Sequence, residues 1–369
     1  MKLRRFILAI VAAASLVAGC AIEPPLHLRQ ALKVVVKVVW KAEIYPEGDK
    51  PTGVTLYIFR DGEFYKQQTT ASVDSCMLSL EPGKYKLLMI SQSPDEYGSV
   101  EFTDMTDFEN ASVSILETKS SWFTRALEDG EVLITNPENM VVGVSEEFEV
   151  SAELVEEFNE ELARRRQEKT TKADDTGKTP EEVEAYETLV SYYTIRVPVY
   201  PQSIVSLFWV SIYSENADLL KSVRCSTSGM AKTFLLTKGT TNEEEATQII
   251  TEWSLTIDDP VNRVGHLDGK VATFGFPNGE KPSPQRDSTL NVTTLLADYK
   301  TTDNYVFSVG DKITEEKPPD GYRSVYRLIL GSVTEPVMHP PDVRPEEQAS
   351  GFDATVSDWE EGESRDISM

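Results

Sequence analysis

Histidines and clustered carboxylates are the side chains with which this chain could do acid–base chemistry. The three histidines, His27, His266 and His339, lie far apart in sequence and near turn residues, so we expect surface or turn positions and neither a zinc site nor a catalytic triad. The acidic groups Glu243–Glu245 and Asp258–Asp259 could supply the two carboxylates that a glycosidase needs. In so acidic a chain, however, such groups are more often solvated surface.

The sequence lacks the short motifs that carry most other catalytic chemistry. It contains no glycine-rich dinucleotide or phosphate loop, no Gly-x-Ser-x-Gly turn and no His-Glu-x-x-His helix. Asp303 and Asp311 lack the alternating ligands and the closing glutamate of an EF-hand loop. We therefore predict a protein that is not an enzyme and that needs no cofactor and no metal ion.

One cysteine has the surroundings of a lipidation site. Residues 1–5 carry three basic side chains and lead into the apolar run Phe6–Val17, which is broken only by Ser15. A membrane-spanning helix needs about 20 apolar residues, so this run is too short to span and is typical of a secretory signal peptide. The run closes on Val17-Ala18-Gly19-Cys20, which resembles the bacterial lipobox, where small residues let the lipoprotein signal peptidase reach the bond before a diacylated cysteine.

We therefore expect removal of residues 1–19 and attachment of Cys20 to the membrane, with residues 20–31 as a tether. A diacylglyceryl thioether together with an N-terminal acyl chain such as palmitate gives more than one buried chain, so retention in a lipid bilayer should be stable. An ordinary signal peptide with a chance cysteine is the alternative. Only Glu23 is acidic just after Cys20, so the sequence does not decide whether an outer-membrane anchor faces the cell surface or the periplasm.

Composition limits the class of partner and the number of domains. The 369 residues carry a formal net charge of -25, which argues against nucleic acid because phosphate binding needs clustered Lys and Arg. The roughly 350 residues left after the signal exceed what one core usually serves, so two domains are expected. Cys76 and Cys225 are expected on strands of different domains, and therefore as buried free thiols rather than a disulfide.

The first half of the chain reads as a series of short strands. Leu32–Trp40 is β-branched and flanked by polar residues, and Gly53–Phe59 alternates at period two before the Asp61-Gly62 hairpin turn. The turn Glu81-Pro82-Gly83 predicts a second hairpin that joins Met77–Leu80 to Lys84–Ile90. Further strands are expected at Ser112–Leu116, Glu131–Thr135 and Met140–Val144. This spacing is typical of a β-sandwich over residues 32–145.

A charged connector, residues 146–190, follows. Its first part is rich in glutamate and favours a helix that ends near Arg164-Arg165-Arg166, where the positive charges would complement the helix dipole on a solvated face. Residues 169–180 are polar and poor in structure-forming residues. We expect this connector to be partly helical.

Residues 191–369 again have the sequence pattern of strands, and we expect them to form a second β domain. The expected strands are Tyr192–Tyr200, Ile204–Tyr213, Thr233–Leu236, Ala246–Ile257, Lys270–Phe276, Asn304–Val309, Ser324–Leu330 and the alternating segment Phe352–Trp359. Trp122, Trp209 and Trp253 could form a platform on which a sugar stacks. Because Trp40, Trp209 and Trp253 lie within apolar or alternating runs, core packing is the favoured interpretation of those three.

Several segments together resemble lipoproteins of Bacteroidales-type gut bacteria, in a family of unknown function related to fimbrillins and to fimbrial anchor lipoproteins such as that of the minor fimbrium. The segments that carry this resemblance are Cys20–Leu28 leading into Val34–Trp40, Ile195–Tyr200, Phe208–Val210, Leu219–Arg224, Ser228–Met230, Phe274–Phe276 and Val356–Glu360. The resemblance implies an all-β fold of two tandem transthyretin-like, Greek-key β-sandwich domains. It covers nearly the whole chain.

The resemblance also implies a role in a pilus or fimbrium and in cell adhesion. Subunits of that kind join by strand addition, in which an extended segment of one protein completes an open sheet edge of another. It makes Arg29 a candidate for protease processing, and it makes Phe352, Ala354, Val356 and Trp359 a candidate strand-exchange segment. We expect partners of two kinds, pilin-like subunits and the lipid bilayer. A surface glycan-binding lipoprotein is the alternative.

Overall fold

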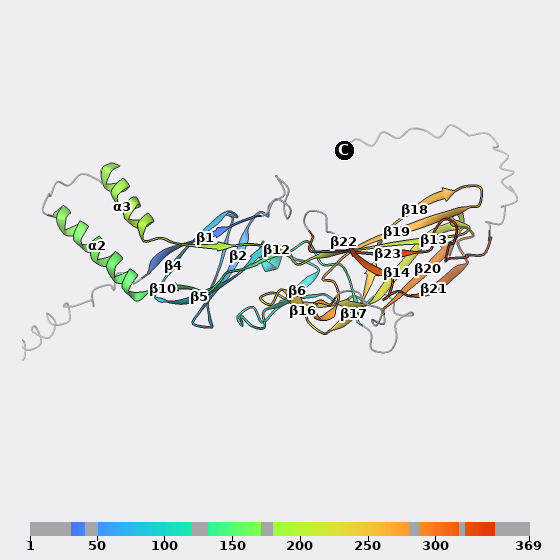
Figure 1. Ribbon diagram of the computed structural model, residues 1–369, viewed down its shortest axis with the longest axis horizontal. Coiled ribbons are helices and arrows are strands. Elements are labelled where there is room, and N and C mark those ends of the chain that lie inside the picture. Colours follow the sequence, from blue (N-terminus) through green and yellow to red (C-terminus); the bar gives the residue numbers. More distant parts are fainter. Residues whose placement is uncertain are drawn as a thin grey trace, which may run out of the picture.

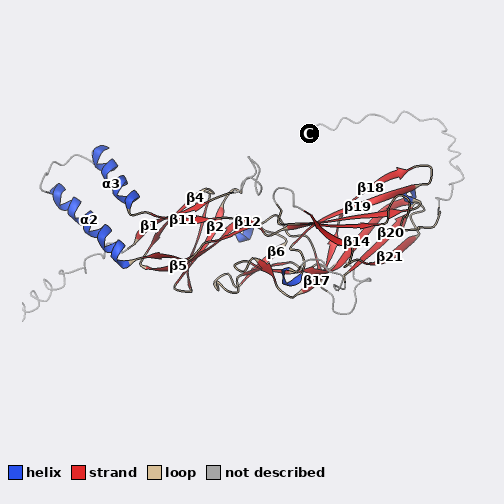
Figure 2. Ribbon diagram, in the orientation of Figure 1, coloured by secondary structure: helices blue, strands red, loops and turns tan. Residues whose placement is uncertain are grey.

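The computed structural model describes residues 31–40, 51–119, 132–170, 180–280, 288–316 and 322–343. Strands dominate these ranges, and two helices lie together at one end of an elongated molecule (Figure 2). The all-β sandwich fold expected from the sequence is confirmed. No helix in the described part of the chain is both long and apolar enough to cross a membrane.

The N-terminal sandwich consists of two facing sheets. The smaller sheet has the order β11 (Ile195–Val199), β1 (Leu32–Val38), β4 (Ser75–Leu80). The larger sheet has the order β12 (Gln202–Ser203), β9 (Val141–Val144), β5 (Gly83–Ser91), β2 (Val54–Arg60), β3 (Glu63–Thr70), and β10 (Phe148–Val150) pairs with β5. Every second residue of β1 is buried, so the alternation in the sequence becomes one apolar face against the core.

Of the two turns predicted in this N-terminal lobe, one is confirmed and the other joins different strands than expected. Asp61 and Gly62 have φ values of 52° and 91°, so they form the two-residue turn that joins β2 to β3, as predicted. The prediction of a hairpin between Met77–Leu80 and Lys84–Ile90 was wrong, because β4 pairs with β1 and β5 pairs with β2. Leu80 and Tyr85 are both buried in the same core from opposite sheets, so the turn between them crosses from one layer of the sandwich to the other.

The C-terminal sandwich also has two sheets. One, here called the outer sheet, has the order β18 (Glu252–Asp259), β19 (Val264–Thr273), β13 (Ser206–Ser214), β23 (Val325–Leu330), β22 (Ile313–Glu316). The other has the order β21 (Thr302–Ser308), β20 (Thr289–Leu296), β14 (Leu220–Ala231), β17 (Glu245–Ile250), β8 (Leu133–Ile134). The single strand expected at Ala246–Ile257 is therefore two strands, β17 and β18, which belong to different sheets and are separated by Thr251 alone.

A middle layer joins the two sandwiches. It has the order β16 (Thr240–Thr241), β15 (Thr233–Leu235), β7 (Ser112–Ile115), β6 (Val100–Thr103). Strand β2 is buried on both faces, with Leu56 in the N-terminal core and Tyr57 in the core beneath this middle layer. Strand β14 ends with Met230 in the C-terminal core and Ala231 in the middle core. The apolar interior thus runs along the length of the rod that Figure 1 shows.

Strand pairs cross the domain boundaries expected at residues 145 and 190. Strand β11 pairs in parallel with β1, β8 pairs with β17, and β15 pairs with β7. The division into residues 32–145 and 191–369 stays a proposal, with strands exchanged between the two parts.

The connector between β10 and β11 is helical, as expected for part of its length. It contains α2 (Ala152–Thr170) and α3 (Pro180–Tyr192) at the end of the N-terminal lobe (Figure 1). The Ser151 hydroxyl accepts a bond from the Leu154 amide at 3.2 Å, which caps the first turn of α2. Arg164 and Arg165 both donate to Glu161, so these arginines are paired along the helix. Short 3-10 turns occur at η1 (Pro94–Glu96), η2 (Ala217–Leu219) and η3 (Pro277–Gly279).

Candidate functional site

Four of the sites expected from the sequence lie outside the described residues. These are the lipidation residue Cys20, the processing residue Arg29, the strand-exchange residues Phe352, Ala354, Val356 and Trp359, and Trp122 of the aromatic platform. They stay predictions. The described chain begins one residue before β1, whose first residue, Leu32, lies three positions after Arg29. Cleavage after Arg29 would therefore separate Cys20 from the chain and leave β1 in its sheet.

Strand β1 is the central strand of its sheet. It pairs antiparallel with β4 from Leu32 to Lys37 and in parallel with β11 from Val34 to Val38. The side chains of Val34 and Val36 are completely buried. A chain tethered at its N-terminus would therefore enter the fold through a strand that is held on both sides.

The edge of the neighbouring strand β4 is covered by polar side chains of β3. The Gln68 side chain donates to the Met77 carbonyl oxygen at 3.2 Å, and the Lys66 ammonium donates to the Ser79 carbonyl oxygen at 3.4 Å. These bonds satisfy main-chain groups that would otherwise be open to another strand. The edge of β4 is therefore protected.

Strand β18 forms a more open edge at the opposite end of the molecule (Figure 1). It pairs with β19 on one side, and among the described strands none pairs with its other side. Its central residues, Ser254–Ile257, contain neither proline nor lysine, the residues that commonly protect an edge. Leu255 and Ile257 are 39% and 37% exposed, so the strand offers unpaired main-chain groups beside apolar side chains.

The change of sheet at Thr251 explains why β18 is uncovered. Strand β17 pairs with β14 from Cys225 to Ala231 and then crosses to the outer sheet. The earlier residues of β14, Leu220–Val223, pair with β20 alone among the described strands. The sheet that contains β14 is therefore one strand short beside Leu220–Val223.

A hollow of about 410 Å³ lies on the solvent face of the outer sheet. The strand register brings Glu252, Lys270, Trp209 and Arg327 into one row across β18, β19, β13 and β23. The next row on the same face holds Ser254, Asp268 and Ser211, and these side chains complete the walls. The guanidinium of Arg327 lies 4.6 Å from the centre of the Trp209 ring.

The aromatic platform proposed from the sequence does not form from Trp209 and Trp253. Trp253 lies in register with Gly269 and with the buried Val210, so its ring packs toward the C-terminal core as expected. Trp209 lies one position away along β13, on the opposite face. The core position expected for Trp209 was therefore wrong. Strand alternation explains the difference, because inward and outward residues follow one another in an apolar run.

His266 is part of a polar network beside the hollow rather than a turn residue. It lies on β19, where its Nδ1 is 2.7 Å from Asp258 Oδ2 and its Nε2 is 3.1 Å from Asp268 Oδ2. The hydrogen bond to Asp258, opposed by partial burial and assisted by the charge of Asp268, raises the pKa of His266. Ser211 donates to the other oxygen of Asp268 at 2.5 Å, so this carboxylate is held in place.

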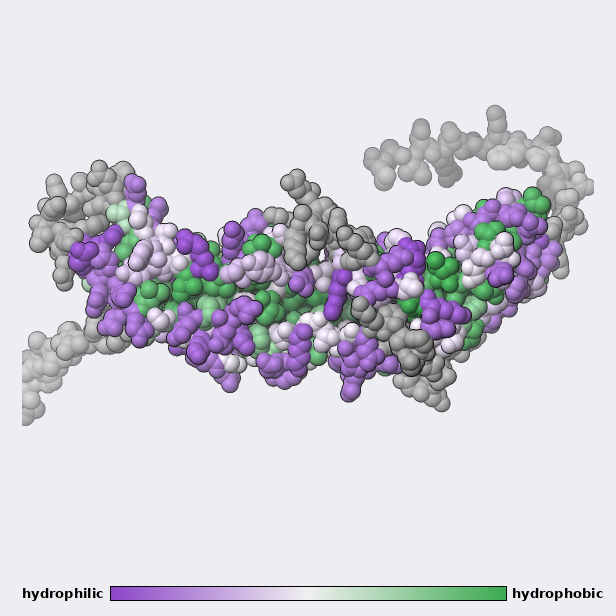
Figure 3. All heavy atoms as spheres, viewed as in Figure 1, coloured by the Kyte–Doolittle hydropathy of each residue, from purple (hydrophilic) through white to green (hydrophobic). Residues whose placement is uncertain are grey.

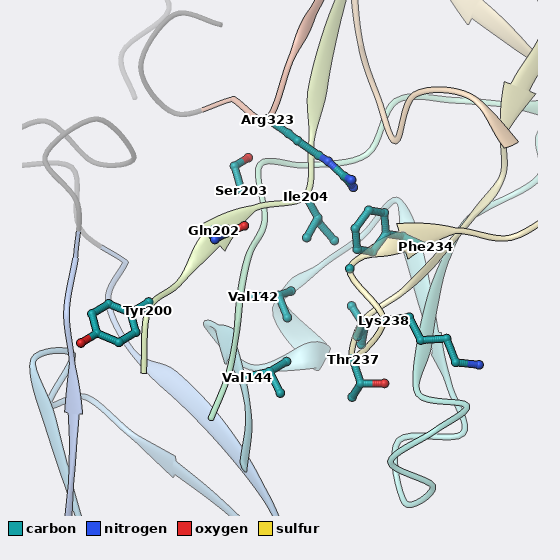
Figure 4. A pocket seen from close by; sticks show the side chains of 12 residues that line it. Val142, Val144, Tyr200, Gln202, Ser203, Ile204, Phe234, Thr237, Lys238 and Arg323 are labelled. Carbon is teal, nitrogen blue, oxygen red and sulfur yellow. The ribbon is translucent and has the colours of Figure 1, made fainter. Parts of the chain in front are cut away.

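A second cavity, of about 260 Å³, lies near the junction of the two lobes (Figure 4). Val142, Val144 and Ile204 form apolar walls, and Lys238 and Arg323 are its cations. The Arg323 guanidinium lies 5.0 Å from the centre of the Phe234 ring. Since most ligand pockets exceed about 300 Å³ and hold a few converging polar groups, we assign this cavity to the joint between lobes.

The remaining reactive side chains are not gathered into a site. Cys76 and Cys225 are buried and free, as expected, and burial raises the pKa of both thiols. Glu244 accepts a bond from Thr233 in the middle layer, whereas Asp258 and Asp259 lie at the end of β18. Within the described ranges no group of three or more His, Cys, Asp or Glu could hold a metal ion. The surface is largely hydrophilic, with apolar patches along both lobes of the visible face (Figure 3).

Comparison with known proteins gives one family match and several structural relatives. A family model described as a domain of unknown function (DUF5119) matches residues 26–251, more than half of the chain. No curated protein matches the chain in sequence. A candidate adhesin from Bacteroides ovatus ATCC 8483 has 12% identity and a TM-score of 0.51, over 89% of this chain and 98% of that chain. That likeness shows a shared fold.

Two other structures are similar at lower scores. The fimbrial anchor protein Mfa2 from Porphyromonas gingivalis has 11% identity and a TM-score of 0.43, over 81% of this chain and 90% of that chain. A fimbrial assembly protein from Parabacteroides distasonis ATCC 8503 has 11% identity and a TM-score of 0.33, over 83% and 93% of the two chains.

Proposed function

Because the chain belongs to the DUF5119 family, whose function its description leaves open, we propose its role from its geometry: a non-enzymatic, membrane-anchored, fimbrillin-like lipoprotein. It anchors a pilus or fimbrium, or helps to assemble one, by accepting a strand from a partner subunit. The observation that carries this proposal is the position of β18, an open and partly apolar edge at the end of the rod opposite α2 and α3 (Figure 1). The strand nearest the tether, β1, lies in the lobe that carries those helices.

The open edge offers the two kinds of contact that strand addition needs, main-chain hydrogen bonds and apolar packing. An added strand would bond to the free main-chain groups of β18 and place apolar side chains beside Leu255 and Ile257. Removing apolar surface from water contributes roughly 25 cal/mol per Å², and the main-chain bonds fix the register. Because side chains alternate between the two faces of a strand, this register would determine which residues of the partner strand face the core.

The proposal also assigns roles to the N-terminal tether and to the C-terminal strand-exchange segment. Lipidation of Cys20 would hold the protein in the outer membrane, at the cell surface or on the periplasmic face, and cleavage after Arg29 would release it. The segment Phe352–Trp359 would serve as a strand for exchange with another subunit. Asp342, near the end of the described chain, is 2.9 Å from Arg263 in the turn after β18, so the described part of the chain ends close to that turn.

The test of strand addition is a pair of charged edge variants. Leu255→Lys with Ile257→Lys should abolish co-purification of a pilin-like subunit from the bacterial envelope, because an added strand would bury two ammonium groups. Val306→Lys is the matched control, since Val306 is 70% exposed on the edge strand β21 of the other sheet. If the double variant retains its partner, or the wild-type protein has no companion subunit, the proposal is wrong.

Anchoring is tested separately. Cys20→Ser should abolish labelling by radioactive palmitate and leave residues 1–19 attached, because the lipoprotein signal peptidase cuts before a diacylated cysteine. A protein that is still labelled, or still cleaved before residue 20, after this change would contradict lipidation at Cys20.

A further inference from the structure

The hollow on the outer sheet has the dimensions and the wall chemistry of a small-molecule site. Its volume of about 410 Å³ lies within the range of about 300–1,000 Å³ that is usual for ligand pockets. It is separate from the exposed apolar side chains of β18, since Leu255 and Ile257 alternate with Ser254, which faces the hollow. A strand added to β18 would therefore not fill this hollow.

On the solvent face, the walls combine the ring of one of the two lining tryptophans with side chains of both charges and two hydroxyls. The ring is Trp209, the cations are Lys270 and Arg327, and the carboxylates are Glu252 and Asp268. A strongly anionic ligand would meet the two carboxylates, and a cationic ligand would meet the two cations. A neutral ligand that carries many hydroxyl groups can donate to the carboxylates and accept from Lys270. Its carbon-bound hydrogens can pack on an indole.

The key groups are held in place before any ligand binds. Asp268 bonds to Ser211 and to His266, and Arg327 donates to Glu316 at 2.9 Å. The Trp209 ring is fixed under the Arg327 guanidinium. Preorganised side chains lose little conformational entropy on binding, which favours affinity for a small ligand.

Trp209 also carries a group that the fold does not satisfy. Its indole N–H is buried and has no acceptor in the described part of the chain. A buried donor without an acceptor costs about 1–3 kcal/mol, and such groups call for an explanation in a native structure.

We propose that this hollow is a binding subsite for a neutral hexose unit of a glycan, with Trp209 as the stacking surface and Asp268 and Lys270 as the hydroxyl-binding pair. The subsite does not depend on strand addition, because it uses the solvent face of the sheet. A protein that holds a partner through β18 could bind a saccharide beside that contact.

The experiment is a glycan array probed with the full chain carrying Cys20→Ser, followed by calorimetry with mannohexaose, maltohexaose and polysialic acid. We expect binding to at least one neutral oligosaccharide and none to polysialic acid. Trp209→Ala and Asp268→Asn should each weaken that binding about tenfold or more. Tyr299→Ala is the matched control, because Tyr299 is 70% exposed and does not line the hollow.

Three results would overturn the inference. They are no binding of wild-type protein to any neutral glycan, a preference for polysialic acid, and unchanged affinity in Trp209→Ala. Circular dichroism and the urea midpoint of each variant separate loss of the subsite from loss of the fold. If Trp209→Ala unfolds, Trp209→Phe, which keeps a smaller ring, should retain the fold and bind more weakly, and full affinity in Trp209→Phe would count against stacking on the indole.

Discussion

Replacing Gly269 with alanine should loosen β18 from the body of the C-terminal sandwich. An ideal Cβ at Gly269 would lie 2.6 Å, 2.7 Å and 2.8 Å from three ring carbons of Trp253. Carbon atoms in contact normally lie about 3.5–4.0 Å apart, so the indole would have to move by about 1 Å. Its movement would strain the hydrogen bond from Trp253 Nε1 to the Ile250 carbonyl oxygen, now 3.0 Å long.

The expected cost follows from two contributions. Overpacking of this kind usually costs about 1–3 kcal/mol, and a strained hydrogen bond adds at most about 1 kcal/mol. Urea unfolding of Gly269→Ala should therefore show a free energy of unfolding lower by about 1–4 kcal/mol. Because the strain is local, Gly269→Ala should speed the hydrogen exchange of the β18 and β19 amides, relative to wild type, more than that of the β1 amides.

A double-mutant cycle makes this prediction specific. In a Trp253→Ala background the ring is gone, so Gly269→Ala should cost no more than about 0.5 kcal/mol. Gly98→Ala is the matched control, since its Cβ would meet only a Glu138 carboxylate oxygen, at 3.6 Å. The reasoning is refuted if Gly269→Ala leaves the urea midpoint unchanged, or if its cost is the same with and without the Trp253 ring.

Three further predictions concern other parts of the molecule. The hydrogen bond to Asp258 raises the pKa of His266 in the folded protein. This pairing contributes stability that is fully present below the unfolded pKa of about 6.5 and is lost as pH rises through the folded pKa. His266→Asn should therefore flatten the pH dependence of the urea midpoint between pH 5 and 9, roughly the span over which a histidine titrates. Val36→Ala, at a fully buried position in β1, should lower the free energy of unfolding by about 2 kcal/mol in urea titration, and a change below about 0.5 kcal/mol would contradict the packing described. Gln68→Ala uncovers the Met77 carbonyl on the edge of β4, so size-exclusion chromatography should show stronger concentration-dependent association than the wild-type protein has.

The sequence predicted local structure well and the pairing of strands less well. Alternation placed β1 and β2 and the Asp61-Gly62 turn because these depend on neighbouring residues alone. The turn at Glu81–Gly83 was misassigned because a turn between sheets uses the same Pro and Gly as a hairpin. The resemblance to a Bacteroidales family of unknown function is confirmed by the family match over residues 26–251.

The hollow could be predicted only in part. The sequence singled out Trp209 and Trp253, but its analysis placed both in the core, because a shift of one position along a strand reverses the face that a side chain occupies. Arg327 and Asp268 come from strands far away in sequence, and only the pairing of β13 with β19 and β23 brings them to Trp209. The alternation of Ser211 and Tyr213 with buried residues was the one signal that could have placed Trp209 outside.

The position of β1 between β4 and β11 has a mechanical consequence for a protein tethered at its N-terminus. A pull on a distant partner would be transmitted to Leu32 and directed along β1. The main-chain bonds to β4 and β11 run across that direction, so they would bear the load together instead of opening one after another. Detachment under flow would then be limited by the rate at which this strand is pulled out, and not by the equilibrium stability of the lobe.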